Sequence, residues 1–479
     1  MSQMVNDKLI ILHTNDIHSH FEMMSANAAV ISRERKAAGE QAVLALDIGD
    51  HMDRAAVETE GTMGQANVDV INLTGYDAIT IGNNEGLTVP PSALEAAYAG
   101  LLCPVVCCNL YELDSGKPPA WMKEHIIIEK NGIKIGITGA TAPFSQFYTL
   151  LGWNSRDPET SIAQQVQLLR DQVDVLIVMS HLGIIADKIL AERIPGIDII
   201  LGGHTHHLLE EPLFIEGTAV CGAGKFGNYV GKVIVEWKPD EGRYAVTGGS
   251  CIPVSGEELD PEVERAVLIH RQQAEEHLKE AVAITDRKLE IHYDQESSFA
   301  NLLAQAVRHY ASSDISIVNS GQLLGSLPDG EISAGMIHSL CPSPINPCVI
   351  KLSGADILQA LEESLLPEYY DKKIFGYGFR GKVLGGLAVD GMEVLYNNEG
   401  SSYHKIIQAS VQGIPIERER EYRVGTLDMF TFKVGYESLA KGKDIVFMLP
   451  EFLRDLLRQE LSRPGALEQS FLHRFVPLI

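Results

Sequence analysis

The chain has 479 residues, which is more than one ordinary hydrophobic core accommodates and predicts two or three domains. Its 64 acidic residues outnumber its 39 basic ones, and the formal net charge of −25 argues against a general DNA- or RNA-binding protein. This charge does not argue against a small phosphorylated substrate, because a bound metal ion can supply positive charge locally.

The cysteines and the apolar content indicate in which cellular compartment the protein occurs. The seven cysteines are Cys103, Cys107, Cys108, Cys221, Cys251, Cys341 and Cys348. Their number is odd and their spacing is not that of a disulfide scaffold, so we expect buried thiols. The first residues lack the features of a secretory signal, and no segment approaches the roughly 20 apolar residues of a membrane span. We therefore expect a cytoplasmic protein without a membrane partner.

Short apolar runs alternate with amphipathic stretches in the first half of the chain. The runs predict strands at 8–13, 41–46, 78–81, 104–107, 133–138, 173–179, 197–201, 213–222 and 231–237, with polar turns after the last. Helical spacing of apolar residues predicts helices at 26–38 and 64–74. Continuously apolar strands that alternate with helices are typical of an α/β layered domain.

The pattern changes near Ser255. Residues 261–281 are charged, lack glycine and carry apolar residues at helical spacing, which predicts a long connecting helix. A second block then combines predicted helices at 299–310, 354–364 and 453–461 with strands at 315–318 and across 394–424. The sequence therefore predicts domains at 1–254 and 285–479, joined by a linker helix within 255–284.

Polar side chains gather where five of the predicted strands end, at residues 13–18, 47–50, 82–85, 180–183 and 202–207. Ligands of α/β sheets collect at the carboxyl ends of the strands. Aspartate, asparagine and histidine are ligands of divalent transition metals, and these clusters contain enough of them for two ions that share one carboxylate. Two ions about 3.5–4 Å apart can activate a water and neutralise a phosphoryl group.

The order of these clusters resembles the motif set of the calcineurin-like metallophosphoesterases. The matching pieces are Asp16-x-His18, Gly49-Asp50, Gly82-Asn83-x-Glu85, Ser180-His181 and Gly203-His204-Thr205-His206. The second block narrows the resemblance to the two-domain 5′-nucleotidase and UDP-sugar hydrolase family. Its landmarks are Asn319–Gly321, Ile332–Gly335, Lys351–Gly354 and Gly435-Tyr436. The resemblance covers nearly the whole chain.

The resemblance implies an N-terminal four-layer β-sandwich flanked by helices and a smaller α+β C-terminal domain. It also implies two divalent metal ions, for which Mn²⁺, Zn²⁺ and Fe all suit the mixed ligands. One ion would be held by Asp16, His18 and His206, the other by Asn83, His181 and His204, and Asp50 would bridge them. Asp47 is the less favoured bridge, because the family ligand is the Asp of Gly-Asp.

The catalytic stretch departs from the family pattern. The family reads Gly-Asn-His-Glu-Phe-Asp, with a catalytic histidine and the aspartate that orients it, whereas this chain has Asn84 and Leu87 at those two positions. An amide can donate a hydrogen bond but cannot deliver a proton near neutral pH. We expect Asn84 to be a neutral donor to the phosphoryl oxygen in a hydrolase that favours good leaving groups.

The second block departs as well. The family arginine that faces the substrate phosphate is replaced in the stretch from Asn319 to Leu324, and the base-stacking aromatic aligns near Gly381. The side chains that could rebuild a substrate pocket are Asn319, Phe379, Arg380, Phe432 and Tyr436. Aromatic residues in these positions are equally compatible with a hydrophobic core.

One further motif matches a known binding fingerprint in its residue types but not in its structural context. Residues 222–227 read Gly-Ala-Gly-Lys-Phe-Gly, as in a dinucleotide fingerprint, but a β-rich run follows where that motif needs a helix. We interpret these glycines as turn residues.

The resemblance predicts a metal-dependent phosphoester hydrolase that uses a metal-bridging water. Its substrate would be a nucleotide or a related small phosphorylated metabolite, and a nucleic acid polymer is not expected as a partner. Two alternatives stay open. One is a catalytically impaired nucleotide- or metal-binding sensor or scaffold, which the replacements at Asn84 and Leu87 favour. The other is a phosphodiesterase that tolerates Asn84.

Overall fold

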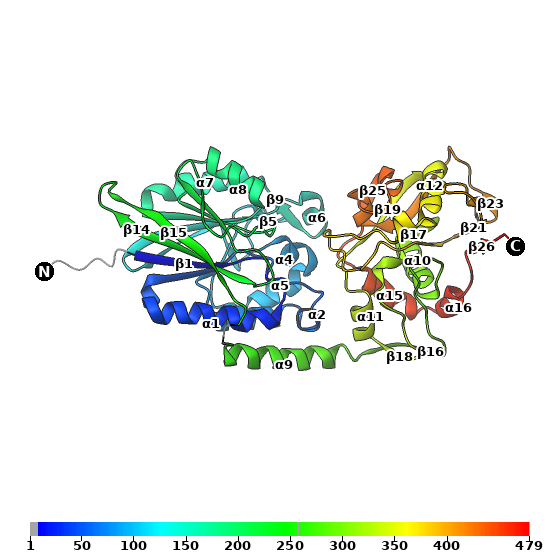
Figure 1. Ribbon diagram of the computed structural model, residues 1–479, viewed down its shortest axis with the longest axis horizontal. Helices are drawn as coiled ribbons and strands as arrows, with labels where there is room; N and C mark the ends of the chain where they lie inside the picture. Colours follow the sequence, from blue (N-terminus) through cyan, green and yellow to red (C-terminus); the bar gives the residue numbers. More distant parts are fainter. Residues whose placement is uncertain (1–7, 257, 479) are drawn as a thin grey trace. The chain divides into compact units, whose positions relative to one another are not determined.

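The computed structural model describes residues 8–256 and 258–478 (Figure 1). The chain separates into two compact units, of which the first ends at Ala274 and the second begins at Glu275. Among the described residues, none of the helices combines the length and the apolar composition that a membrane crossing requires.

The first unit is built on two sheets whose central strands are parallel. The seven-stranded sheet has the order β15 (Arg243–Pro253), β14 (Tyr229–Lys238), β1 (Lys8–Thr14), β2 (Val43–Asp47), β3 (Ala78–Ile79), β4 (Val105–Val106) and β6 (Met122–Lys123). The six-stranded sheet has the order β12 (Leu213–Ile215), β13 (Thr218–Gly222), β11 (Ile199–Gly202), β10 (Val175–His181), β8 (Ile133–Thr141) and β7 (His125–Lys130). The strands predicted from apolar runs are therefore confirmed, except for the single strand expected over 213–222.

Each central strand is buried on both faces, which explains why its apolar run is continuous. In β1, Leu9 and Ile11 pack in the core that also holds Ile135 and Ile177 of the other sheet. Because side chains alternate along a strand, Ile10 of β1 joins a second core on the outer face of its own sheet. The two sheets thus pack against each other, and each needs a further layer outside.

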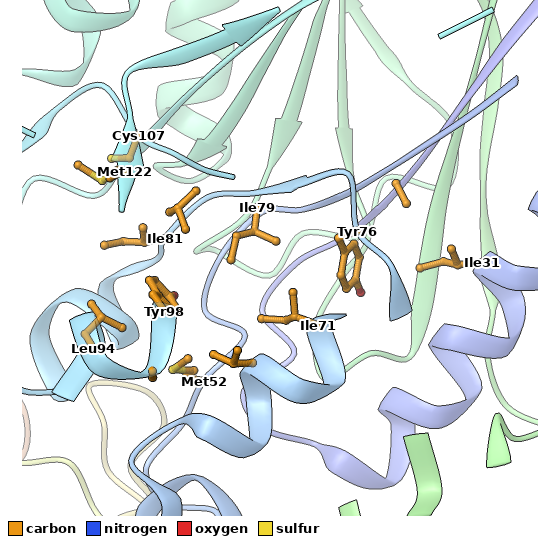
Figure 2. Close-up of a cluster of buried hydrophobic side chains, with 14 of the residues drawn as sticks. Ile31, Met52, Ile71, Tyr76, Ile79, Ile81, Leu94, Tyr98, Cys107 and Met122 are labelled. Atoms are coloured by element: carbon orange, nitrogen blue, oxygen red, sulfur yellow. The ribbon is translucent and has the colours of Figure 1, made fainter. Parts of the chain in front are cut away.

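Helices form the two outer layers, on opposite sides of the paired sheets (Figure 1). One side has α1 (Phe21–Ala38), α2 (Val57–Thr62), α3 (Gln65–Thr74), α4 (Asn83–Thr88) and α5 (Pro91–Tyr98), and the other has α7 (Pro158–Leu169) and α8 (Ile184–Arg193). Figure 2 shows Ile71 of α3 and Leu94 and Tyr98 of α5 facing Ile79 of β3. The expected four-layer sandwich is confirmed. The remaining elements of this unit are β5 (Leu110–Glu112), β9 (Trp153–Ser155) and α6 (Ser145–Leu150).

Two stretches of the first unit differ from the sequence predictions. The single strand expected over 213–222 is the hairpin β12–β13, since Glu216 and Gly217 form a two-residue turn with φ of 46° and 87°. The polar turns expected after Trp237 include strand β15. This strand lies at a sheet edge with Tyr244 and Val246 only partly buried, so its hydrophobic signal is weak.

The expected connecting helix is α9 (Pro261–His277), which ends before the strand β16 (Ala281–Thr285). Helix α9 packs directly on the first unit, because a Cβ on Gly61 of α2 would come within 2.5 Å of Ala274. An ion pair of 2.7 Å joins His270 to Asp69. The predicted assignment of residues 255–284 to a separate linker stays a prediction.

The second unit combines one five-stranded sheet, one four-stranded sheet and a two-stranded ribbon. The five-stranded sheet has the order β20 (Leu387–Asp390), β17 (Ile315–Asn319), β24 (Glu421–Leu427), β19 (Pro347–Ser353) and β25 (Lys443–Phe447). The four-stranded sheet has β23 (Ile414–Pro415), β22 (Ile406–Val411), β21 (Met392–Tyr396) and β26 (Phe475–Pro477), and β16 pairs with β18 (Gly330–Ser333).

Helix α10 (Ser298–Ala311) contacts β17, β20 and β24 of the five-stranded sheet and is strongly amphipathic. The other helices of this unit are α11 (Ala334–Leu340), α12 (Gly354–Ser364), α13 (Pro367–Tyr370), α14 (Asp428–Thr431), α15 (Leu453–Leu461) and α16 (Ala466–Ser470). Helices α12 and α15 have the limits that the sequence predicts, and the expected α+β domain is confirmed.

Asp428 makes the stability of the second unit depend on pH. Burial raises the pKa of this carboxyl from 3.8 to about 7, although N–H groups of Asn346 and Met429 oppose the shift. Between these values the unfolded chain has lost a proton that folded Asp428 keeps, so stability falls by up to about 1.4 kcal/mol per pH unit as the pH rises. Between pH 5.5 and 7.0, we expect the melting temperature of Asp428→Asn to fall less than that of the wild type. Equal losses would show that Asp428 is ionised in the fold.

Candidate metal centre

The predicted metal ligands of the first unit all lie where parallel strands end. Asp16 and His18 follow β1, Asp50 follows β2 and Asn83 follows β3. His181 is the last residue of β10, and His204 and His206 follow β11. The carboxyl ends of these strands lie along common edges of the two sheets, and the loops that leave them meet. Residues from positions 16 to 206 are thereby brought into one cluster.

Two groups of candidate ligands share Asp16. His206 Nε2 lies 3.4 Å from Asp16 Oδ1, and His18 Nε2 lies 3.2 Å from His206 Nε2. In the second group, His181 Nε2 lies 3.4 Å from Asp50 Oδ2 and 3.9 Å from Asp16 Oδ1. Asp50 Oδ2 is also 3.8 Å from His18 Nε2. Within each group the ligand atoms lie within 4.8 Å of one another. The carboxylates of Asp16 and Asp50 therefore stand between the two histidine groups.

Two buried side-chain atoms of the cluster have no hydrogen-bond partner and are of the kind that binds a metal ion. His181 is fully buried, and its Nδ1 donates to the carbonyl of Ile48 at 2.8 Å, while its Nε2 makes no hydrogen bond. The buried Oδ1 of Asn83 is also without a hydrogen bond. Buried polar atoms are normally satisfied, and a histidine that ligates a metal usually donates its other N–H to a carbonyl or carboxylate. His204 belongs to the same cluster, since its ring centroid lies 5.4 Å from that of His181.

The backbone of the cluster is strained. Residues other than glycine rarely adopt positive φ, and such residues concentrate at functional sites. Most of the predicted ligands adopt it here: Asp16 (51°), His18 (49°), Asp50 (51°), His204 (72°) and His206 (58°). The surrounding hydrogen bonds hold these conformations in place.

Glu85 ties two of the ligand loops together. Its buried carboxylate accepts hydrogen bonds from the backbone N–H groups of Gly82 (2.8 Å), Asp50 (3.0 Å) and Met52 (2.8 Å). Burial and the nearby Asp50 raise the pKa of Glu85 to about 7. In the sequence, Glu85 follows a predicted strand and has no predicted role of its own. Its place in the Gly-Asn-x-Glu motif is the signal that could have found it.

Asn15 and the loop after β11 orient Asp16. The Asn15 Nδ2 donates to Asp16 Oδ2 at 2.7 Å and to the carbonyl of Gly224 at 2.7 Å. Its Oδ1 accepts from the backbone N–H of Ala223 at 2.9 Å, and the N–H of His204 donates to Asp16 Oδ2 at 2.9 Å. Asn15 was not predicted as a supporting residue, because its partners at Gly224 and Ala223 are distant in the sequence.

Burial and charge set the protonation of the cluster. Burial opposes the ionisation of Asp50, but His181 and His18 hold the pKa of this carboxyl well below its usual range. Burial lowers the pKa of His18 and of His204. Burial also disfavours the charged form of His181, but Asp50 raises the pKa of this imidazole to about 10. Metal binding at His181 would therefore release a proton.

Asn84 faces other protein groups. Its Nδ2 lies 2.9 Å from His18 Nδ1 and 3.1 Å from the carbonyl oxygen of Met52, and its backbone N–H donates to Asp50 Oδ1 at 2.7 Å. Leu87 is partly buried and packs against the core beneath α5. In this arrangement the amide of Asn84 contacts His18, a predicted ligand, and its role as a donor to the phosphoryl oxygen stays a prediction.

The predicted substrate residues of the second unit fall into two groups, three that are buried and two that lie at the surface. Asn319 is buried and donates to the carbonyl of Leu384 at 2.6 Å, and Phe379 is 5% exposed. Tyr436 is also buried, and its hydroxyl donates to the carbonyl of Gly385 at 2.8 Å. These three side chains are part of the core of the unit, and their burial gives no support to a role in substrate binding.

Phe432 and Arg380 lie at the surface of the second unit. The Phe432 side chain is 42% exposed and stacks between two further rings. Its centroid is 6.2 Å from that of Tyr377 at an interplanar angle of 19°, and 6.5 Å from that of Phe447 at 13°. Arg380 is exposed, and its backbone N–H donates to Ser343. Tyr377 and Phe447 were not predicted as neighbours of Phe432, because stacking across separate segments leaves no local signal in the sequence.

Two family models match the chain. Residues 9–208 match the calcineurin-like phosphoesterase model, and residues 276–440 match the model of the 5′-nucleotidase C-terminal domain. The first match contains all the predicted metal ligands. The second contains all five predicted substrate residues.

Similar proteins have the same two-part organisation. An uncharacterized metallophosphoesterase, YunD of Bacillus subtilis, is 35% identical over 96% of this chain and 100% of its own length. A 5′-nucleotidase of Vibrio cholerae is 24% identical over 74% of this chain and 75% of its own length. The structure of Haemophilus influenzae NAD nucleotidase is similar in fold, with a TM-score of 0.69, 18% identity and coverage of 98% and 97% of the two chains. This chain belongs to the calcineurin-like metallophosphoesterases that carry a 5′-nucleotidase C-terminal domain, and it is a phosphoester hydrolase.

Proposed function

We propose that this protein hydrolyses the phosphoester bond of a nucleotide, or of a related small phosphorylated metabolite, with two divalent metal ions. The observation that carries the proposal is the position of Asp50 Oδ2, which is 3.4 Å from His181 Nε2 and 3.8 Å from His18 Nε2. One carboxylate oxygen thus faces a histidine of each predicted ligand set, as a bridge requires. The V. cholerae relative named as a 5′-nucleotidase supports a nucleotide as substrate.

In this proposal each ion has three ligands besides the shared carboxylate. One proposed set is Asp16, His18 and His206, the other is Asn83, His181 and His204, and we assign Asp50 to both. The residue that the two geometric groups share is Asp16. Divalent ions bound here would make water nucleophilic and neutralise charge on the phosphoryl oxygens. Mn²⁺, Zn²⁺ and Fe all suit carboxylate, amide and imidazole ligands.

The side chains around the ligands orient them and limit the chemistry. Asn15 holds Asp16, and Glu85 keeps the loops of Asp50 and Asn83 together. Asn84 cannot donate a proton to a leaving group near neutral pH. The proposed enzyme therefore acts best on esters whose leaving group departs without protonation, and Asn84 contributes by positioning His18.

Metal analysis combined with a substrate panel tests this proposal. We expect about two equivalents of a divalent metal by elemental analysis of the purified protein, and turnover of aryl phosphates and nucleotides with added Mn²⁺. The panel should contain phosphomonoesters and phosphodiesters. Full metal occupancy without turnover of any ester would contradict hydrolysis and would favour a metal- or nucleotide-binding sensor.

Phe432 is the proposed contact for a nucleobase in the second unit, through the exposed part of a ring that already stacks on Tyr377 and Phe447. A base that stacks on an aromatic side chain gains roughly 1–3 kcal/mol, and a contact beside the occupied faces gains less, so we expect Phe432→Ala to raise the KM for nucleotides about 5-fold. Its stability should change little because the ring is 42% exposed. The matched control is Tyr436→Ala, which empties a buried site and should destabilise the unit by about 3–5 kcal/mol.

Two measurements separate these roles, namely the KM for a nucleotide against a base-free aryl phosphate and the melting temperature. Phe432→Ala should affect only the first. An unchanged nucleotide KM in Phe432→Ala would remove this residue from the proposed site.

We also place the protein in the cytoplasm. All seven cysteines are free, and burial raises the pKa of the Cys107 thiol to about 11 and that of Cys341 to about 12. Buried protonated thiols are inert and compatible with a reducing compartment. Thiol titration of the denatured protein should find seven reactive groups, and a smaller number would argue for disulfides and an oxidising compartment.

A further inference from the structure

The loop that contains residues 222–227 lies against the candidate metal centre. It follows β13 and leads into β14, so the helix that a dinucleotide-binding loop needs is not there. Its backbone is bonded to the ligand loops instead. Phe226 N–H donates to the carbonyl of Asp16 at 2.8 Å, and Gly224 N–H donates to that of His207 at 3.1 Å. This loop is therefore positioned by the same segments that present the metal ligands.

Phe226 has an unusual backbone and packs on the histidines of the centre. Its φ is 61°, between Gly224 at 77° and Gly227 at 69°. Its ring centroid lies 4.2 Å from that of His20, 5.9 Å from that of His18 and 6.3 Å from that of His206. A left-handed aromatic residue is costly and persists where the surroundings require it. The strain sets the ring against two of the predicted ligands.

Lys225 lies against this ring, which itself contacts two of the predicted ligands. Its side chain is exposed, and its Nζ lies 4.5 Å from the centroid of Phe226. An ammonium at this distance over an aromatic face is attracted by the ring. The face of Phe226 that Lys225 covers is not available for stacking, so the ring acts as a support for the ammonium.

The side chains around the candidate metal centre are rich in carboxylates. The centre contains the carboxylates of Asp16, Asp50 and Asp53 near His18. Asn84, which lies 2.9 Å from His18 Nδ1, is a neutral amide and adds no positive charge. A phosphomonoester brings about two negative charges and a phosphodiester only one. A lysine at the edge therefore favours the monoester.

We propose that Lys225 is a substrate-positioning residue that binds a non-bridging oxygen of the phosphoryl group and selects dianionic phosphomonoesters over phosphodiesters. Phe226 holds the ammonium in place. This inference rests on the proposed phosphoester hydrolysis and adds the class of substrate, but binding of inorganic phosphate tests it without turnover.

The test uses the full-length, Mn²⁺-loaded protein and three variants. Lys225→Gln removes the charge, Lys225→Arg keeps it, and Lys188→Gln is the matched control, because Lys188 is an exposed lysine on α8. Calorimetric titration with inorganic phosphate should give an affinity about 10-fold weaker for Lys225→Gln, since a charge-assisted hydrogen bond is lost. Lys225→Arg should restore most of it, and Lys188→Gln should match the wild type.

Kinetics with an aryl phosphate and the matching bis-aryl phosphate complete the test. Lys225→Gln should raise the KM for the monoester about 10-fold with little change in kcat, and should raise the KM for the diester clearly less, because the diester carries only one negative charge. Metal content and melting temperature should equal those of the wild type.

The outcomes for the two proposals are distinct. Phosphate affinity and monoester KM within twofold of the wild type in Lys225→Gln would overturn the role of Lys225, as would an absence of phosphate binding by the wild type. Phosphate binding that depends on Lys225 in a protein without turnover would support the role of Lys225 and contradict the proposed hydrolysis.

Discussion

Asp50→Asn is expected to lower the affinity for divalent metal by at least roughly 10²-fold and to abolish measurable hydrolysis. Substitution of residues that only orient a metal ligand already costs about 10–100-fold, and Asp50 faces both histidine groups through Oδ2. The amide would keep the shape of the side chain but lose the negative charge that a bridge between two cations supplies. Elemental analysis and aryl phosphate turnover measure the effect.

Asp47→Asn is the matched control, three residues away. Burial raises the pKa of Asp47 to about 8, against the opposing hydrogen bonds from Thr14 and Gly49. This carboxyl is mostly protonated at neutral pH, so asparagine carries the same charge and a similar shape. We expect metal content and turnover within about threefold of the wild type. The assignment of the bridge would be wrong if Asp47→Asn lost the metal and Asp50→Asn kept it.

Asn84→His, combined with Leu87→Asp, is expected to accelerate the hydrolysis of alkyl phosphoesters by about 10²-fold or more. A positioned general acid contributes typically 10²–10⁴-fold, and an alkoxide leaving group needs the proton far more than a phenolate does. Aryl phosphates should gain little. The single variant Asn84→His should gain less, because Leu87 offers no carboxylate to orient the new imidazole.

The ratio of alkyl to aryl turnover and its pH dependence measure this effect. A general acid must be protonated, so the alkyl rate of the double variant should fall as the pH rises through the pKa of the histidine. Asn84→Gln is the control, since it keeps an amide. An equal gain on aryl and alkyl esters, or no gain on alkyl esters, would show that Asn84 does not limit proton delivery.

The positions of the strands were accessible from the sequence because parallel strands are buried on both faces. The alternation of Leu9 and Ile10 between two cores makes the run of β1 wholly apolar. Edge strand β15 was missed because one of its faces is exposed, so its pattern resembles that of a loop. Local composition therefore predicts strands well in the middle of a sheet and poorly at its edge.

It could also be predicted from the sequence that the candidate ligands lie close together. The residues that hold these ligands in position could not be predicted. Asn15 contacts Ala223, 208 residues further along the chain, and Glu85 bonds two separate loops. Such contacts exist only after the sheets have formed. In the second unit, Phe432 and Tyr436 look alike in the sequence but are 42% and 0% exposed, because their surroundings come from distant segments.

The left-handed backbone of Asp16, His18, Asp50, His204 and His206 opposes the folding of the first unit. Each such residue costs on the order of 1 kcal/mol, and glycine at the same point would be relaxed. Laboratory evolution that rewards only heat resistance or expression yield would therefore drift toward sequences without this centre. A screen for robust versions of this enzyme has to score turnover in every round.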